Sequence, residues 1–361
     1  MTVRKQAIVL SVVFAVFCAA IIGYFYYFDV SNVGKPIDGR PFLGEVNSHD
    51  HLYYVDTISR LRDEGVGYEL NNDVGISYFF LVLSDFFIGD NEGYAELALF
   101  VNVVFLFLTF FIYIKVCDFY GFDLWGKLLF FAGIHLVYFA QLINKDMLSV
   151  FLILLPVYCV LYRKWWWLLL ATPFFFLVRQ QLFIYLVSFV FLYTAVWPFW
   201  RILVVYMVTC LVASYVVVHA NIIGTESLEG GFSSFVYSVN ESSYLGYLFF
   251  NPVRVLQFVQ DALLSFFFLT PEGVVDMGRL LRVPQVLCLL IMSRPIFNAL
   301  VNTRTGMHEL SRPLYCSLVS YLMAWLMNPT VNARYVMLIA PVLVLLALYA
   351  KKNMTQRSEY A

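Results

Sequence analysis

Charged side chains are scarce in this chain. Asp, Glu, Lys and Arg make up 13% of the 361 residues, whereas soluble domains carry about 25%. Apolar residues make up 61%, and this balance indicates an integral membrane protein, which we expect to be all-α and polytopic. The net charge of −1 excludes a nucleic-acid-binding protein that relies on bulk electrostatic attraction. We therefore expect membrane lipids around the chain and no nucleic acid as a partner.

Motifs for metals, disulfides and nucleotides are also missing. The six cysteines and five histidines show neither CxxC nor HxxxH spacing, and the cysteines lie in or beside apolar runs. They are typical of small core side chains, and we expect no metal site. The chain contains neither GxxxxGK[ST] nor GxGxxG, so no nucleotide-binding loop is expected. No cofactor is predicted.

Apolar stretches of about 20 residues can cross the hydrocarbon core of a bilayer. The first follows the basic segment "MTVRKQ", and "YFYYF" at its end is a poor cleavage site, so we interpret it as an uncleaved helix and not as a secretory signal. The chain forms one integral membrane domain, 1–361, with ten predicted spans: 7–28, 96–116, 127–143, 147–162, 165–178, 182–199, 202–219, 283–303, 313–327 and 335–350.

Lysine and arginine placement orients these spans. The positive-inside tendency puts one set of span ends in the cytoplasm: Arg4/Lys5, Lys115/Lys127, Arg163/Lys164, Arg201, Arg304/Arg312 and Lys351/Lys352. An even number of spans then leaves both termini cytoplasmic, and segments 29–95 and 220–282 on the outer face. We expect a bacterial inner membrane as the location.

Each outer segment holds a stretch that is apolar but interrupted. Residues 74–88 carry Asp85, and residues 253–270 carry Arg254, Gln260 and Asp261. We expect helices of this kind to lie in the membrane interface. If both were spans instead, the total would stay even, but the basic residues between them would face outward, so this alternative is disfavoured.

Residues 47–65, "NSHDHLYYVDTISRLRDEG", concentrate three aspartates, one glutamate, two histidines and two arginines. A helix over 50–62 places Asp50, Tyr53/Tyr54 and Thr57 on one stripe, with Asp50 at the favourable N-terminal end. The alternative is that Asp50 is only an N-cap. Because the stretch follows a span closely and precedes an apolar interfacial helix, we expect it to be held at the membrane surface.

Two further polar clusters lie at outer span ends. One is "INKDML", 143–148, where Lys145 and Asp146 either bind a ligand or simply form a polar turn before a helix. The other is the pair Arg179 and Arg334, which either snorkel to the interface or face a polar cavity. Arginine binds phosphate bidentately, so a lipid phosphate or diphosphate is a natural partner. Arg294 lies inside the predicted span 283–303. The alternative is that this span is bounded wrongly and that Arg294 marks its true end.

These groups suit chemistry on a lipid-linked sugar. The arginines would dock the phosphates, and a carboxylate would deprotonate the acceptor hydroxyl as it attacks the anomeric carbon. The polyprenyl phosphate would then leave with its charge stabilised electrostatically. On these grounds Arg334→Lys is expected to weaken donor use more than Asp146→Asn does.

"HDHLYYVDTISRLRDEG" and "ARYVMLIAP" resemble motifs of the GT-C-fold glycosyltransferases, membrane enzymes that use polyprenyl-phosphate- or diphosphate-linked sugars. The resemblance implies a GT-C-like fold and hexosyltransferase activity with a lipid-linked donor. It places Asp50 as the catalytic acid residue, with His49, His51 and Tyr54 beside it. It also implies that Arg334, followed by Tyr335 and Pro341, contacts the donor phosphate. The chain departs from the family in two ways: His49 and His51 flank Asp50, so the common acidic pair is not adjacent there, and no DxD motif is present.

"INKDMLSVFLIL" and "FLVRQQLFIYL" resemble a second group, the oligosaccharide repeat-unit polymerases of O-antigen and capsule type. Those proteins rely on outer-face arginines. Both resemblances imply a polyprenyl-linked sugar as donor and a glycan or lipid-linked acceptor, in cell-envelope polysaccharide assembly. A flippase or transporter is disfavoured, because its charges should lie mid-membrane and no internal repeat is visible. The predicted substrate-binding set is Arg334, Tyr335, Arg179, His49, His51, Tyr54, Lys145 and Asp146.

Overall fold

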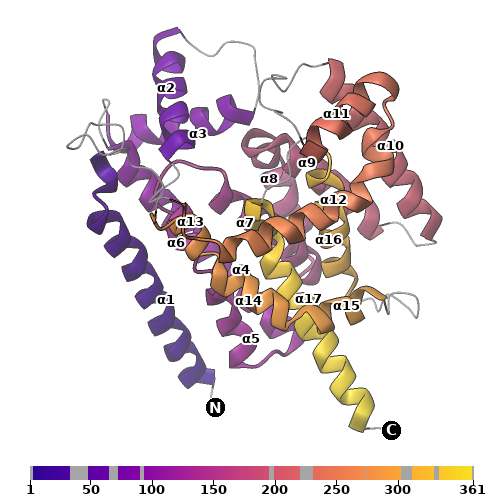
Figure 1. Cartoon of the computed structure of the whole chain (residues 1–361). Coiled ribbons are helices and arrows are strands. Elements are labelled where there is room, and N and C mark those ends of the chain that lie inside the picture. The colour runs from indigo at the N-terminus through magenta and orange to yellow at the C-terminus, as the bar shows by residue number, and fades with distance from the viewer. Residues whose placement is uncertain are drawn as a thin grey trace.

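The computed structural model describes residues 3–32, 48–64, 72–89, 93–194, 199–219, 231–271, 273–301, 311–328 and 333–359. Within these ranges the regular structure is helical, apart from one isolated β-bridge between Leu269 and Val275 (Figure 1). The all-α prediction is confirmed for this part of the chain.

Within the described ranges, three helices are long and apolar enough to cross a membrane. They are α1 (Val3–Tyr27), α4 (Tyr94–Tyr120) and α17 (Ala333–Glu359). The N-terminal end of α1 and the C-terminal end of α17 lie at the same end of the molecule, whereas α2 (Ser48–Glu64), α3 (Asn72–Phe87) and α11 (Gly231–Ser243) lie at the other (Figure 1). The chain is therefore an integral membrane protein by the length and composition of its helices.

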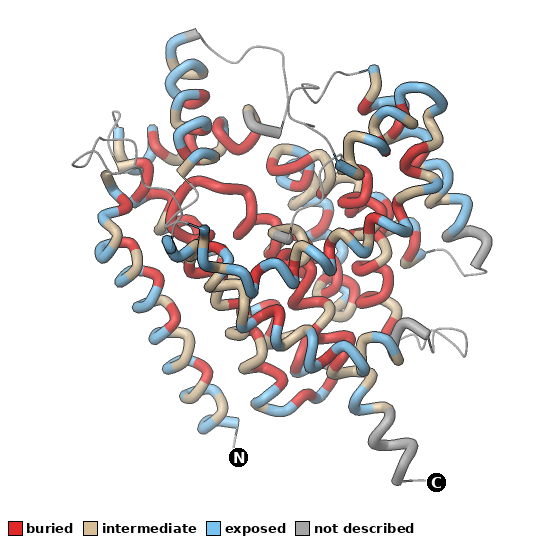
Figure 2. The backbone as a smooth tube through the Cα atoms, viewed as in Figure 1, coloured by how far each residue is buried: buried red, intermediate tan, exposed pale blue. Residues whose placement is uncertain are grey.

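Shorter apolar helices fill the space between the long ones. They are α7 (Asp146–Leu161), α8 (Trp165–Val178), α9 (Gln180–Thr194), α10 (Phe199–His219) and α16 (Arg312–Trp325). Helix α4 packs on α7, and α9 packs on α16, so the most buried backbone lies in the middle of the molecule (Figure 2). At about 1.5 Å per residue, α7 reaches roughly 24 Å and falls short of the hydrocarbon thickness.

The prediction of ten spans is not borne out. Among the described residues, three helices have the length and hydropathy of a span, and two of the predicted stretches are not single helices. Residues 127–143 form α5 (Leu124–Leu128), a 3₁₀ turn η2 (Leu129–Ala132) and α6 (Leu136–Phe139), followed by a loop up to α7. The helical run ends because Gly133 leaves the helical region, with φ −72° and ψ 43°, and polar side chains then bind the loop backbone in place of helical bonds.

Residues 283–303 are the second correction. They form α14 (Val283–Ile291) and α15 (Ser293–Val301), which are separated at Met292. Pro295 explains the break, because proline has no N–H to donate to the carbonyl of Ile291 and its ring clashes with that carbonyl. Arg294 thus lies at the start of a new helix, which agrees with the alternative that it marks a misplaced boundary.

The first segment expected on the outer face contains, within its described residues, the helical pair α2 and α3. Asp85 of α3 accepts a hydrogen bond from Arg62 of α2 at 2.5 Å. Helix α3 also packs against α8, where Gly75 is required: a Cβ at this position would lie 2.0 Å from the carbonyl oxygen of Leu177. This close contact holds α3 against the end of α8, and α3 in turn packs on α2, which carries Asp50.

The second segment expected on the outer face contains, within its described residues, α11, α12 (Gly246–Leu263), a 3₁₀ turn η4 (Leu264–Phe266) and α13 (Met277–Leu280). Helix α12 is amphipathic. It exposes Phe249, Val253 and Leu256 on one face and buries Arg254 on the other. An exposed apolar stripe on a helix of this kind agrees with the expected interfacial position.

Candidate functional site

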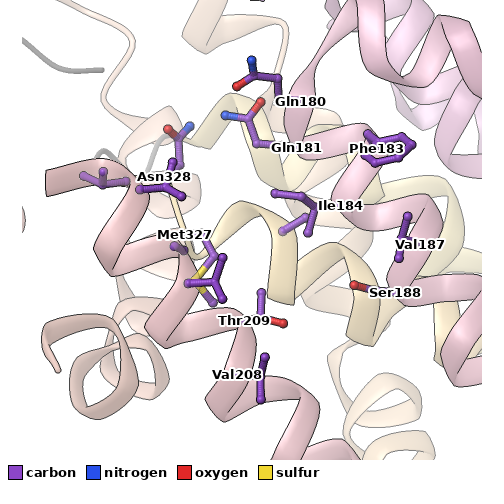
Figure 3. A pocket seen from close by; sticks show the side chains of 15 residues that line it. Gln180, Gln181, Phe183, Ile184, Val187, Ser188, Val208, Thr209, Met327 and Asn328 are labelled. Carbon is purple, nitrogen blue, oxygen red and sulfur yellow. The ribbon is translucent and has the colours of Figure 1, made fainter. Parts of the chain in front are cut away.

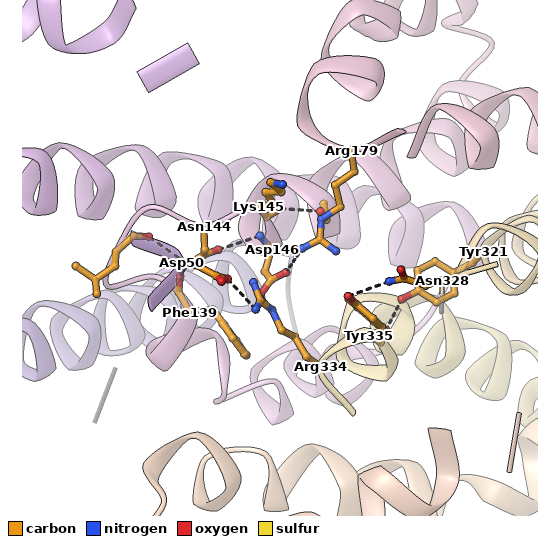
Figure 4. Close-up of polar contacts among 12 residues, drawn as sticks. Asp50, Phe139, Asn144, Lys145, Asp146, Arg179, Tyr321, Asn328, Arg334 and Tyr335 are labelled. Atoms are coloured by element: carbon orange, nitrogen blue, oxygen red, sulfur yellow. Dashed lines mark hydrogen bonds and ion pairs between the residues drawn. The ribbon is translucent and has the colours of Figure 1, made fainter. Parts of the chain in front are cut away.

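The three polar clusters of the sequence meet in space (Figure 4). Arg334, in the first turn of α17, donates from Nη1 to Asp50 Oδ2 at 2.9 Å and from Nε to Asp146 Oδ2. Arg179, between α8 and α9, donates from Nη2 to the other carboxylate oxygen of Asp146 at 2.7 Å. Asp50 comes from α2 and Asp146 from α7, so four separate parts of the chain build one ion-pair network.

The two carboxylates of this network differ in access. The Asp146 side chain is 2% exposed, whereas the Asp50 side chain is 31% exposed. Asp146 also begins α7, where the helix dipole favours a negative charge, and its N–H donates to Asn144 Oδ1 at 2.9 Å. Asp146 therefore orients the two arginines, and Asp50 is the carboxylate that a substrate can reach.

The loop that carries Asp146 is fully buried, and neighbouring side chains bind its backbone. Asn102 of α4 donates from Nδ2 to the carbonyls of Ala140 (3.1 Å) and Leu142 (2.9 Å), and Gln141 donates to the carbonyl of Ile21 in α1 at 3.2 Å. The N–H and C=O groups of a buried, irregular backbone need such partners, because water cannot reach them to form hydrogen bonds. The same bonds explain why this polar stretch interrupts the expected span.

His51 belongs to this support and not to the ligand-facing surface. Its side chain is buried, and its Nδ1 accepts the N–H of Ile143 at 3.3 Å. Burial lowers the pKa of His51 from 6.5 to about 4, so the neutral ring that accepts this bond persists in mildly acidic solution. The structure thus assigns His51 to loop positioning, in contrast to the substrate contact expected from the sequence.

A pH dependence of stability follows from this shift. Between pH 6.5 and about 4 the unfolded chain binds a proton at His51 that the folded chain does not. The free energy of unfolding should therefore decrease as the pH is lowered through this window. The contribution of this residue is on the order of 1 kcal/mol per pH unit. His51→Asn retains an acceptor close to the position of Nδ1 but does not titrate.

The measurement is the melting temperature in detergent from pH 7.5 to pH 4.5. We expect the wild-type protein to lose more stability across this range than His51→Asn. Parallel curves for the two proteins would show that His51 is not the buried neutral group that the structure describes.

Aromatic rings lie beside every cation of the site. Lys145 Nζ lies 5.3 Å from the centroid of the Tyr54 ring, Arg179 Cζ lies 5.7 Å from that of Tyr335, and Arg334 Cζ lies 5.3 Å from that of Phe139. Such contacts attract the cations and limit their motion. Tyr54 and Tyr335 are therefore positioning residues. The site holds three cations, Lys145, Arg179 and Arg334, and two carboxylates, Asp50 and Asp146. Its net charge is therefore +1, which favours binding of an anion.

His49 differs from the rest of the predicted set. It is exposed in the first turn of α2, and only its sequence position beside Asp50 supports a substrate contact.

Sequence reasoning missed the role of Arg254. This residue is completely buried, with its guanidinium 5.3 Å from the centroid of the Tyr247 ring. It donates to the carbonyls of Leu326 and Asn328, which follow α16. The Asn328 side chain in turn donates to the Tyr335 hydroxyl at 3.0 Å. Arg254 therefore holds the end of α16 close to the start of α17, where Arg334 lies. Its only sequence signal was a charge on an amphipathic stretch.

Replacement of Arg254 by methionine should destabilise the protein. The variant removes the donor to two carbonyls, and each buried polar group left unpaired costs about 1–3 kcal/mol. We expect a clear drop in the detergent melting temperature. Arg60→Met is the matched control, because the Arg60 side chain is 56% exposed beside Asp56 and should change little. Equal melting temperatures for Arg254→Met and Arg60→Met would contradict this account of Arg254.

The described residues contain no group of three or more His, Cys, Asp or Glu side chains that could hold a metal ion. Comparison with known proteins found no matching family, no matching curated protein and no matching solved structure. The two resemblances read from the sequence therefore stay hypotheses.

Proposed function

We propose that this protein is a membrane glycosyltransferase that uses a polyprenyl-phosphate- or diphosphate-linked sugar on the outer face of the membrane. One observation carries the proposal: an accessible carboxylate, Asp50, shares Arg334 with the buried carboxylate of Asp146. An acid that a substrate can reach thus lies beside cations that can bind phosphate. A GT-C-like fold and a location in a bacterial inner membrane, with both termini cytoplasmic, belong to the same proposal.

Donor binding changes the partner of Arg334. The donor phosphate accepts hydrogen bonds from Arg334, which therefore releases Asp50 while Asp146 keeps the guanidinium oriented. Arg179 and Lys145 add positive charge beside the phosphate. Asp50 then no longer shares Arg334 and can accept a proton beside the bound donor.

The reaction is a displacement at the anomeric carbon of the donor sugar. The acceptor hydroxyl oxygen forms the new bond to this carbon as the bond to the phosphate oxygen breaks and its electron pair stays on the phosphate. Asp50 takes the hydroxyl proton. Arg334, Arg179 and Lys145 stabilise the negative charge that the leaving polyprenyl phosphate or diphosphate gains.

Repeat-unit polymerisation is the second candidate, and the convergence of Arg179 and Arg334 on Asp146 favours it. Two arginines side by side suit a diphosphate carrier as well as a monophosphate. In this case the donor carries a whole repeat unit or growing glycan, and the arginines contribute more than Asp50 does. A flippase stays disfavoured, because the charged groups gather in one cluster.

A mass-spectrometric profile of polyprenyl-linked glycans, in cells with and without the gene, tests the proposal. Loss of a single-sugar transferase leaves lipid-linked or final glycans that lack one defined sugar. Loss of a polymerase instead leaves complete single repeat units on the lipid. Identical glycan profiles in the two strains would contradict both candidates.

A further inference from the structure

An apolar groove of about 410 Å³ lies between α9, α10 and α16 (Figure 3). Its walls are formed largely by apolar side chains from all three helices: Phe183, Ile184, Val187, Val208, Val212, Ala213, Val216, Val217, Ala324 and Met327. The Thr209 hydroxyl, which also lines the groove, donates to the carbonyl of Val205 at 2.7 Å in its own helix. The walls are thus suited to hydrocarbon.

One end of the groove is polar. Gln180 and Gln181, at the start of α9, lie there with Asn328, while Val208 and Ser188 lie farther along (Figure 3). Amides at one end and hydrocarbon along the length match a chain with a polar head.

The polar end adjoins the candidate functional site. Gln180 directly follows Arg179, and Asn328 donates to the hydroxyl of Tyr335, whose ring lies 5.7 Å from the Arg179 guanidinium carbon. The Arg179 Nε is buried and has no hydrogen-bond partner among the residues that the structure describes. A buried donor of this kind is costly unless an acceptor reaches it. A phosphate oxygen at the mouth of the groove would supply that acceptor.

A second groove, between α4, α7 and α8, provides a contrast. Its volume is about 220 Å³, and its lining, which includes Phe105, Leu152 and Ala171, is entirely apolar. Any lipid acyl chain can bind in this second groove, because its lining residues offer no amide or charged side chain to recognise a particular head group.

We propose that the groove between α9, α10 and α16 binds the head-proximal part of a polyprenyl chain, with the attached phosphate at Arg179. This inference rests on the proposed function and specifies which membrane-facing side of the protein receives the donor. The volume falls within the roughly 300–1,000 Å³ of small-molecule sites, so it holds the first isoprenoid units while the rest of the chain stays in the bilayer.

The test is photo-crosslinking in reconstituted vesicles. The probe is a polyprenyl phosphate with a diazirine near its phosphate end, and crosslinked peptides are assigned by mass spectrometry. We expect crosslinks in α9, α10 or α16, with competition by unlabelled polyprenyl phosphate but not by the same excess of phosphatidylglycerol. Crosslinks confined to α4, α7 and α8, none at all, or equal competition by phosphatidylglycerol would overturn the proposal.

Variants that fill one groove or the other provide a second test of where the probe binds. Ala213→Phe places a ring in the proposed groove, and Ala171→Phe is the matched control in the second groove. Ala213→Phe should reduce crosslinking by about tenfold, equivalent to about 1.4 kcal/mol of binding, and Ala171→Phe should leave it unchanged. Thr209→Phe serves the same purpose if Ala213→Phe does not accumulate. Unchanged crosslinking in a folded groove variant contradicts the proposal.

The groove and the proposed reaction can fail separately. Asp50→Asn should bind the probe at least as well as the wild-type protein, since Asp50 is not part of the groove and its carboxylate competes with the phosphate for Arg334. If the wild-type protein crosslinks in the groove but transfers no sugar, the glycosyltransferase proposal fails and the lipid site stands. Sugar transfer with crosslinks elsewhere overturns the groove alone.

Discussion

Asp50→Asn is expected to abolish glycan product while the protein still accumulates in the membrane. Asparagine has nearly the same shape as aspartate but cannot take the proton of the acceptor hydroxyl. Because a positioned general base contributes about 10²–10⁴ in rate, we expect a loss of at least a hundredfold. The measurement is the amount of product per folded protein in a deletion strain that carries the variant.

Asp56→Asn is the control for this variant, because it lies on the same helix. The Asp56 side chain is 68% exposed and pairs with Arg60 across one helical turn, so its replacement should leave product unchanged. Wild-type product from Asp50→Asn would remove Asp50 as the base and favour the polymerase candidate, in which the arginines contribute more.

Asp146→Asn is expected to impair both stability and activity. Its carboxylate is 2% exposed and binds both arginines. Removal of the charge leaves the buried guanidinium of Arg179 and the partly buried one of Arg334 without their shared anion. Breaking a buried ion pair in this way costs about 3–5 kcal/mol. The measurements are the melting temperature in detergent and the product formed per folded protein.

For stability, the structure predicts the opposite order from the one that the sequence predicts for donor use. Arg334→Lys keeps a cation that can reach one carboxylate, although it loses the planar fork, whereas Asp146→Asn disturbs Arg179 and Arg334 together. We expect the melting temperature of Asp146→Asn to fall below that of Arg334→Lys. If Asp146→Asn instead melts like Asp56→Asn, Asp146 is only the first residue of a helix.

The sequence predicted the parts of the site that depend on local chemistry. The helix over 50–62 is confirmed within α2. Helix α7 begins at Asp146 of "INKDML", and Arg334 is the second residue of α17. The bounds predicted for the span 165–178 match α8. What hydropathy could not predict is that Asp50, Asp146, Arg179 and Arg334 meet, because contacts between distant segments depend on how the helices pack.

The failures have particular causes. Residues 127–143 are apolar enough to suggest a span, but Asn102, far away in the sequence, binds the carbonyls that a continuous helix would satisfy internally. In 283–303, Pro295 was a local signal of a break that the apolar count outweighed. Arg254 was visible as a charge, but its carbonyl partners lie more than seventy residues away.

The central claim is that a sugar leaves its polyprenyl carrier at Asp50 and Arg334. The most direct measurement is the release of free polyprenyl phosphate or diphosphate when purified protein in detergent is mixed with polyprenyl-linked glycans extracted from the deletion strain. We predict release by the wild-type protein and none by Asp50→Asn of equal melting temperature. No release by folded wild-type protein, or equal release by the two proteins, would contradict the account.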